Sequence, residues 1–192
     1  MKYLFNERSE KNHPDETMLS ATQTQGVIPQ NLYGQRVVVV SKGFENLKFV
    51  KKGDFVIHLR SFQGGIEYAY YQGIISAAYT ILEPKSPEYA DFYKYLFKSH
   101  NYIQILKTCV TGIREGQNIN YSVLGRKHIA LPPIEEANEI VNFISQKTSQ
   151  IDTLISSLSQ QITSLKEYKQ RLISDVVTGQ INVQHIVNDN CS

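Results

Sequence analysis

The sequence predicts an α+β protein with three parts: a mixed, β-rich globular domain in residues 1–131, one long coiled-coil helix in residues 132–179, and a tail in residues 180–192. Three observations predict this organisation. Runs of β-branched and aromatic residues, separated by turn formers, fill the middle of the first part. No Pro or Gly occurs between Pro133 and Gly179. Apolar residues in that interval recur in the alternating four- and three-residue steps of a coiled coil.

Strand patterns dominate the globular domain as far as residue 82. The expected strands are residues 19–23, 37–40, 55–59, 66–71 and 74–82, each rich in β-branched or aromatic side chains. Residues 60–65 lie between two of these strands and contain the pair Gly64-Gly65. Because glycine adopts backbone angles that other residues avoid, we expect a loop there.

Helical patterns begin after the last long strand. Ser86-Pro87-Glu88 combines an N-cap residue, a proline at the first helical position and an acid in the first turn. Apolar residues at helical spacing follow as far as Phe97. A second short helix is expected at residues 102–106, a loop at 111–125 and a short strand at 127–131.

The long helix carries two series of residues, each with a seven-residue repeat. The first series is Ile144, Ile151, Leu158, Leu165 and Leu172, and the second is Thr148, Ile155, Ile162, Lys169 and Val176. Together they form the a/d seam of a coiled coil, whose polar members weaken it but set its register and partner. We expect the helix interface at Ile144, Ile151, Ile155, Leu158, Ile162, Leu165 and Leu172. At ~1.5 Å per residue the helix spans roughly 65 Å, so it joins parts and sets a distance between them.

Composition and charge limit the class of protein. Hydrophobic residues make up 41% of the 192 positions, enough for a core. The two cysteines, Cys109 and Cys191, are far apart in the sequence, which argues against a disulfide framework and favours a reducing compartment. There is no signal-peptide pattern or membrane-crossing apolar run, so we expect a cytoplasmic protein. Residues 1–130 have a net charge of +5 and residues 131–192 of −3. This asymmetry fits nucleic-acid binding, and equally ordinary scatter of surface charge.

The sequence contains no catalytic or metal-binding constellation. Its five histidines are scattered without metal-ligand spacing, and no Walker loop, nucleophile elbow or dinucleotide-binding glycine motif occurs. Asp152 with Glu167 and Lys169 matches the spacing of a metal-dependent nuclease. These residues fall on the coiled-coil helix, however, so we interpret them as solvated helix charges.

Side chains suited to DNA contact gather in and around the β region. We expect DNA contacts from Arg60, Ser61, Gln63, Lys42 and Arg114, and phosphate contacts from Lys51 and Lys52. Arginine pairs with guanine, glutamine with adenine, and lysine usually holds phosphate. Each lysine is also explained as an ordinary surface charge. Tyr68, Tyr70 and Tyr71 lie among these residues and are also explained by core packing.

Several segments carry a resemblance to a known family. They are residues 19–22 (LSAT), 26–29 (GVIP), 53–56 (GDFV), 60–65 (RSFQGG), 73–76 (GIIS), 112–114 (GIR), 131–136 (LPPIEE), 151–155 (IDTLI), 165–170 (LKEYKQ) and 172–179 (LISDVVTG). With these segments the sequence resembles the specificity subunit of type I restriction–modification enzymes, over nearly its whole length. It departs from the family at Ala137, where glutamine is usual, and in having one recognition domain and one long helix instead of two.

The resemblance implies a non-catalytic subunit that is either half-size or the C-terminal half of a full one. Its globular part would be a target recognition domain that reads one half of a split site in double-stranded DNA. Its long helix would pack antiparallel against that of a second copy, giving a homodimer, and would seat methyltransferase (modification) and restriction subunits. S-adenosylmethionine, ATP and Mg²⁺ would belong to those partner subunits. The alternative is a coiled-coil assembly module without specific DNA binding.

Overall fold

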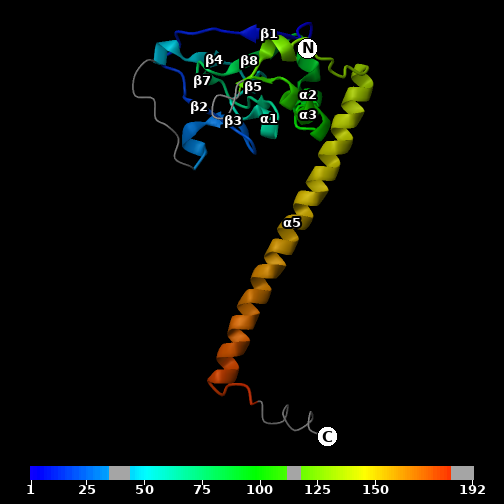
Figure 1. Cartoon of the computed structure of the whole chain (residues 1–192). Coiled ribbons are helices and arrows are strands. Elements are labelled where there is room, and N and C mark those ends of the chain that lie inside the picture. Colours follow the sequence, from blue (N-terminus) through cyan, green and yellow to red (C-terminus); the bar gives the residue numbers. More distant parts are fainter. Residues whose placement is uncertain (35–43, 112–117, 183–192) are drawn as a thin grey trace. The chain divides into compact units, whose positions relative to one another are not determined.

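The computed structural model describes residues 1–34, 44–111 and 118–182, and its residues divide into two compact units. The first is Met1–Val141 and the second is Asn142–Ser192 (Figure 1). The expected strand at residues 37–40 lies outside the described residues. The mixed domain and the long C-terminal helix that the sequence predicts are both present.

The first unit is built on a four-stranded antiparallel sheet. Its order is β1 (Phe5–Arg8), β8 (Thr80–Pro84), β5 (Phe55–Ile57) and β6 (Glu67–Tyr68). Three two-stranded antiparallel sheets accompany it. They pair β2 (Leu19–Thr22) with β3 (Gly26–Pro29), β4 (Lys48–Val50) with β7 (Gly73–Ile75), and β9 (Val110–Thr111) with β10 (Asn118–Ile119).

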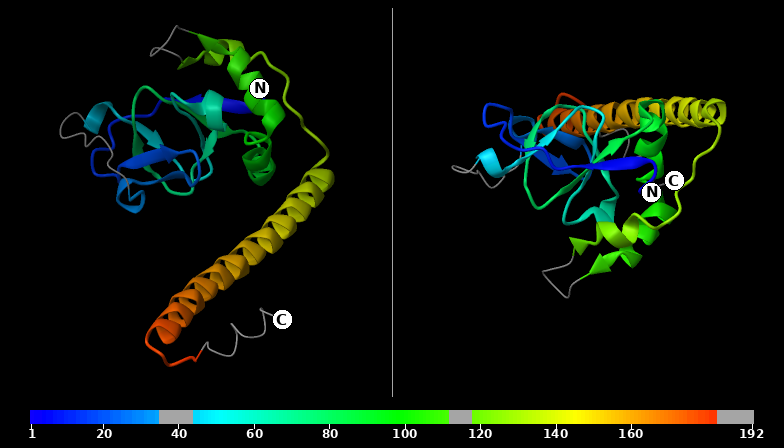
Figure 2. Two further views of the ribbon diagram at one scale, coloured as in Figure 1. Left: turned by 60° about the horizontal axis from the view of Figure 1, so that its bottom comes forward. Right: turned by 90° about the horizontal axis from the view of Figure 1, so that it is seen from above.

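The central strands bury both of their faces, because successive side chains of a strand point to opposite sides. Phe55 and Leu82 enter an apolar cluster shared with the helices, whereas Val56 and Ile81 enter a second cluster shared with β2, β3 and β7. Figure 2 shows the blue and cyan strand pairs at one end of this unit and the green helices at the other. Each fully buried side chain of this size contributes about 1.5–3 kcal/mol to folding.

Short helices cover the sheet. They are η1 (Gln30–Leu32), η2 (Phe44–Asn46), α1 (Ser61–Gly64), η3 (Pro87–Tyr89), α2 (Ala90–Leu96), α3 (His100–Thr108) and α4 (Tyr121–Leu124). The Ser99 hydroxyl caps α3 by accepting from the Tyr102 N–H, 3.3 Å away. The expected cap at Ser86 makes no such side-chain bond, and a 3₁₀ turn precedes α2 there.

Three local predictions need correction. Residues 74–82 form two strands, because a turn at Ser76, where Tyr79 N–H donates to the Ser76 carbonyl at 3.1 Å, separates β7 from β8. Residues 127–131 form no strand: the Lys127 N–H donates to the Leu124 carbonyl and prolongs the turn that ends α4. The expected loop at 111–125 contains β10 and α4 among its described residues.

The long helix α5 (Ile134–Val177) begins directly after Pro132-Pro133 and has Glu135 in its first turn. It ends at Gly179, whose positive φ of +74° is the usual helix-terminating conformation. Its first two turns belong to the first unit, where Ala137 is buried in the helix-side cluster. The first unit therefore extends to Val141, beyond the residue 131 that the sequence suggested. No helix among the described residues combines the length and apolarity needed to cross a membrane.

Two glycines provide a test of the packing around α1. Both have positive φ, but a Cβ on Gly65 would overlap the Phe97 carbonyl oxygen, whereas one on Gly53 would meet nothing within 4 Å. We expect Gly53→Ala to lower the free energy of unfolding by about 1–2 kcal/mol through backbone strain alone. Gly65→Ala must also displace main chain and should cost about 3–5 kcal/mol. Urea unfolding measures both, and equal effects would contradict this packing.

Candidate nucleic-acid interface

The residues expected to contact DNA that the structure describes do not form one site. Lys51 and Lys52 are exposed in the turn before β5, whereas Arg60 and Gln63 are exposed beyond its other end. Strand β5 therefore separates the two pairs. Lys42 and Arg114 lie outside the described residues.

Ser61 is the one of these residues whose predicted role is wrong. It is completely buried, and its Oγ accepts a hydrogen bond from the His58 N–H at 2.9 Å. The Arg60 N–H in turn donates to His58 Nδ1 at 3.1 Å. The expected loop is thus a short helix, α1, whose first residue holds the turn together. Its hydroxyl is not available to DNA, and sequence pattern alone does not distinguish such a buried serine from an exposed one.

Hydrogen bonds to a buried side chain fix the turn that carries Lys51 and Lys52. The buried Asp54 Oδ2 accepts from the Lys51 N–H at 2.8 Å and from Arg8 Nε at 2.9 Å. Burial raises the pKa of Asp54 against the opposing effect of these bonds. The two lysine side chains themselves extend into solvent from a fixed backbone.

A groove that the sequence did not reveal lies beside α1. Three segments line it: the β2–β3 turn, strand β6 with the residue following Ala69, and helix α2 with its C-terminal extension. Its volume is ≈ 330 Å³. The lining residues, here called the tyrosine–lysine groove, are Thr24, Gln25, Gly26, Ile66, Glu67, Tyr68, Tyr70, Lys94, Tyr95 and Lys98.

Lys94 is the cation at the mouth of the tyrosine–lysine groove. Its Nζ lies 5.7 Å from the ring centroids of both Tyr68 and Tyr70, and 5.5 Å from that of Tyr95. Burial acts to lower the pKa of Lys94, but Tyr70 and Asp91 outweigh it and the pKa is raised. The ammonium is therefore charged at neutral pH and held over aromatic faces.

Lys98 has a different role, because its charge is neutralised inside the protein. Its Nζ donates to Glu67 Oε1 at 2.6 Å, to the Gly64 carbonyl at 3.0 Å and to the Gln23 carbonyl at 3.1 Å. Glu67 has no exposed surface, so Lys98 compensates a fully buried carboxylate. One ammonium thereby ties α1, β6 and the β2–β3 turn together.

The β2–β3 turn presents amide side chains from a fixed backbone. The Thr22 hydroxyl donates to the Gly26 carbonyl at 3.0 Å and accepts from the Gln25 N–H at 3.0 Å. Gln23 and Gln25 are exposed on this turn, and Gln63 is exposed on the neighbouring α1. Glutamine amides beside a lysine and open tyrosine faces are the groups that contact base edges, phosphates and sugars in DNA complexes. The signal available in the sequence was the polar run of residues 22–25.

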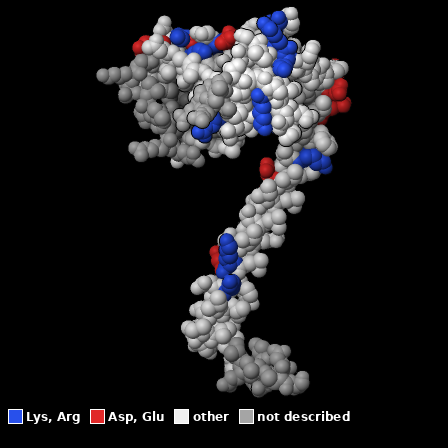
Figure 3. All heavy atoms as spheres, in the orientation of Figure 1, with Lys and Arg blue, Asp and Glu red and all other residues white. Residues whose placement is uncertain are grey.

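The described residues contain no group of three or more His, Cys, Asp or Glu side chains arranged to hold a metal ion. Lys and Arg side chains are interspersed with Asp and Glu on the visible face of the first unit (Figure 3). The lining of the tyrosine–lysine groove offers polar groups and aromatic faces together.

Comparison with known proteins identifies the fold. No protein-family model matches the sequence, and neither does any curated protein. The crystal structure of the HsdS subunit from Thermoanaerobacter tengcongensis is similar, with a TM-score of 0.53 and 17% sequence identity. The match covers 94% of this chain and 44% of that one. The resemblance to a type I specificity subunit is thus confirmed at the level of the fold, and the chain spans less than half of the HsdS subunit's length.

The two lysines of the groove are expected to respond differently to substitution. Lys98→Met leaves Glu67 buried without its cation and should lower the free energy of unfolding by about 3–5 kcal/mol. Lys94→Met removes only a partly exposed pair with Asp91 and should cost about 0–1 kcal/mol. Urea unfolding compares them. The double variant Lys98→Met with Glu67→Gln should recover part of the loss, and a Lys98→Met protein as stable as the wild type would disprove the structural role.

Proposed function

We propose that this chain is a non-catalytic DNA-recognition subunit of a type I restriction–modification complex, reading one half of a bipartite target. The observation that carries the proposal is the fold likeness to the HsdS subunit, which extends over both the β-rich domain and the long helix. The tyrosine–lysine groove supports it, because this surface combines exposed amides, a lysine and aromatic faces. A role on cellular DNA implies a cytoplasmic location.

The partners follow from the same proposal. Methyltransferase and restriction subunits would supply the chemistry and would bind S-adenosylmethionine, ATP and Mg²⁺. The recognition subunit would supply only position and sequence preference. The competing function is a coiled-coil assembly module that binds no specific DNA. Only the exposed apolar face of α5 favours it, and it assigns no role to the tyrosine–lysine groove.

Helix α5 supports an assembly role through its apolar face. Among the seam residues, Ile151, Ile155, Leu158 and Ile162 are each between 53% and 56% exposed. An isolated amphipathic helix gains little stability by itself, and a seam of this kind is normally buried against another helix. We propose a second copy as the occupant, packed antiparallel about a two-fold axis. The resulting homodimer would read a symmetric split target.

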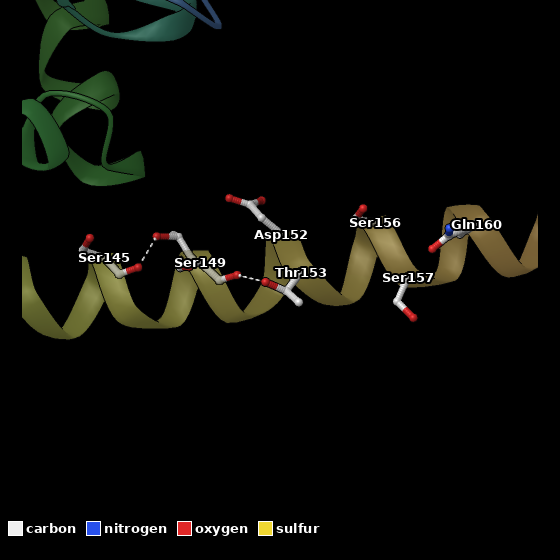
Figure 4. Close-up of a pocket in the computed structure, with 8 residues that line it drawn as sticks. Ser145, Ser149, Asp152, Thr153, Ser156, Ser157 and Gln160 are labelled. Atoms are coloured by element: carbon white, nitrogen blue, oxygen red, sulfur yellow. Dashed lines mark hydrogen bonds between the residues drawn. The ribbon is translucent and has the colours of Figure 1, made fainter.

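The opposite face of α5 supports a second contact. Figure 4 shows small polar side chains along it, including Ser149, Thr153 and Ser156. The Thr153 hydroxyl donates to the Ser149 carbonyl of its own helix at 2.9 Å, so its hydrogen-bonding capacity is partly used internally. Residues 153–165 contain no charged side chain, which leaves the middle of the helix uncharged in Figure 3. Small, uncharged residues permit close helix packing, and we propose that this face seats the methyltransferase.

DNA reading can be tested in the assembled complex by removing single amides. We expect the complex with methyltransferase to prefer one sequence over competitor DNA in gel-shift titrations. Gln25→Ala and Gln63→Ala should each weaken discrimination at one base pair by about 1–3 kcal/mol. Gln104→Ala, an exposed glutamine on α3, is the matched control and should change nothing. If the wild-type complex shows no sequence preference, the proposed recognition function is wrong.

The helix interface can be tested with a pair of charge insertions. Leu158→Asp places a carboxylate in the apolar face and should convert dimers to monomers in sedimentation experiments at tens of micromolar. Ser156→Asp inserts the same charge about 160° around the helix and should leave the dimer intact. If wild-type chains sediment as monomers, the homodimer is wrong. Equal assembly by both variants would place the interface elsewhere.

A further inference from the structure

A second pocket lies where the beginning of the chain meets the segment after α4. Its volume is ≈ 380 Å³. The lining residues, here called the basic pocket, are Met1, Lys2, Tyr3, Leu4, Gly125, Arg126, Lys127, His128, Ile129 and Leu131. Sequence pattern does not bring these residues together, because the two segments that form the pocket are more than a hundred residues apart in the chain.

The basic pocket carries positive charges that no carboxylate in its lining balances. Lys2, Arg126 and Lys127 line it, together with His128, and no Asp or Glu does. These three cations form no ion pair within the described ranges, in contrast to Arg8, Lys94 and Lys98. Like charges held in one concavity repel each other, and an anion bound among them removes that repulsion.

The backbone fixes the walls of the pocket. The Met1 ammonium donates to the Lys127 carbonyl at 3.0 Å, and the Lys2 N–H donates to the Gly125 carbonyl at 3.1 Å. Burial, and then the charge of Lys2, lowers the pKa of the Met1 ammonium, which agrees with a positive potential at this place. The Met1 side chain is buried, and its Sδ accepts from the Tyr102 hydroxyl at 3.3 Å. Hydrogen bonds and burial therefore fix the backbone that carries the cationic side chains.

The side-chain chemistry selects the kind of anion. An arginine fork and lysine ammonium groups match the oxygens of a phosphate group, with which arginine forms two parallel hydrogen bonds. The tyrosine–lysine groove lacks this capacity, since Lys98 is bound to Glu67 and Lys94 lies 3.4 Å from Asp91 Oδ1. The first unit thus has one surface suited to base edges and another suited to phosphate.

We propose that the basic pocket binds a phosphate group, supplied by the backbone of the target DNA. This inference rests on the proposed function for the source of the phosphate, but not for the existence of the site. Such a contact holds the protein on the duplex and carries no sequence information. Lys2, Arg126 and Lys127 are its ligands.

The test compares two double variants of the full chain in complex with methyltransferase. Arg126→Gln with Lys127→Gln removes two charges from the basic pocket. Lys85→Gln with Lys107→Gln removes two charges from exposed positions elsewhere and is the control. DNA affinity is measured across salt concentrations, and the pocket variant should lower the log–log salt slope by about 1 or more on every sequence. The control should keep the wild-type slope and preference.

A second arm separates the sources of phosphate. Inorganic phosphate is titrated into the full chain without DNA, and the amide resonances of residues 125–129 are followed by NMR. Loss of this response in the pocket variant with an unchanged salt slope assigns the site to free phosphate. Absence of both effects overturns the proposal, as does a variant that loses only its affinity for the methyltransferase. A wild-type complex without sequence preference refutes the recognition function, while the phosphate titration still decides the pocket.

Discussion

The ion pair between Lys98 and the fully buried Glu67 is the interaction on which the tyrosine–lysine groove depends. A carboxylate without exposed surface is unfavourable unless a charge and further hydrogen bonds compensate it. Lys98 provides the charge, and its remaining bonds go to carbonyls of α1 and of the β2–β3 turn. The pair therefore does more than neutralise Glu67. It sets the relative positions of the two segments that carry the exposed glutamines.

The same arrangement separates the unpaired cations of this domain from the tyrosine–lysine groove. Lysines that build the groove are paired with carboxylates, so the groove itself has little free positive charge. Unpaired cations gather instead in the basic pocket. Long-range attraction to DNA depends on such unpaired charge, whereas discrimination between bases depends on groups held in fixed geometry. Under the proposed function, the nearly neutral groove would discriminate between bases and the basic pocket would attract the DNA backbone.

Helix α5 depends on different contacts along its length. Its first two turns gain stability from the core of the first unit, where Ala137 is buried. The apolar side chains of the seam are exposed from Ile151 to Leu172, and small polar residues occupy the opposite face. Neither face resembles that of a helix surrounded only by water, which would carry more charge. Both faces have a composition typical of helix surfaces that pack against a partner.

Local patterns in the sequence determined the long helix and several of the strands. A seven-residue repeat and the absence of Pro and Gly define α5 as far as Gly179 because helix formation depends on near neighbours. Strand β2 was likewise visible from its own residues. The break at Ser76 was not, because a turn formed by a single serine interrupts an otherwise strand-like run. The first two turns of α5 belong to the first unit because they pack against its core. A local sequence pattern does not reveal such a tertiary contact.

The tertiary structure alone decided which side chains reach solvent and which meet. Ser61 looked like a contact residue and is buried, while Arg60 beside it is exposed. Lys51 and Arg60 are both expected to contact DNA and lie beyond opposite ends of β5. Glu67 meets Lys98, and Lys2 and Arg126 line one pocket, only because segments distant in sequence pack together. Periodicity specifies the conformation of a segment, but the partners of a charged group depend on the packing of the whole domain.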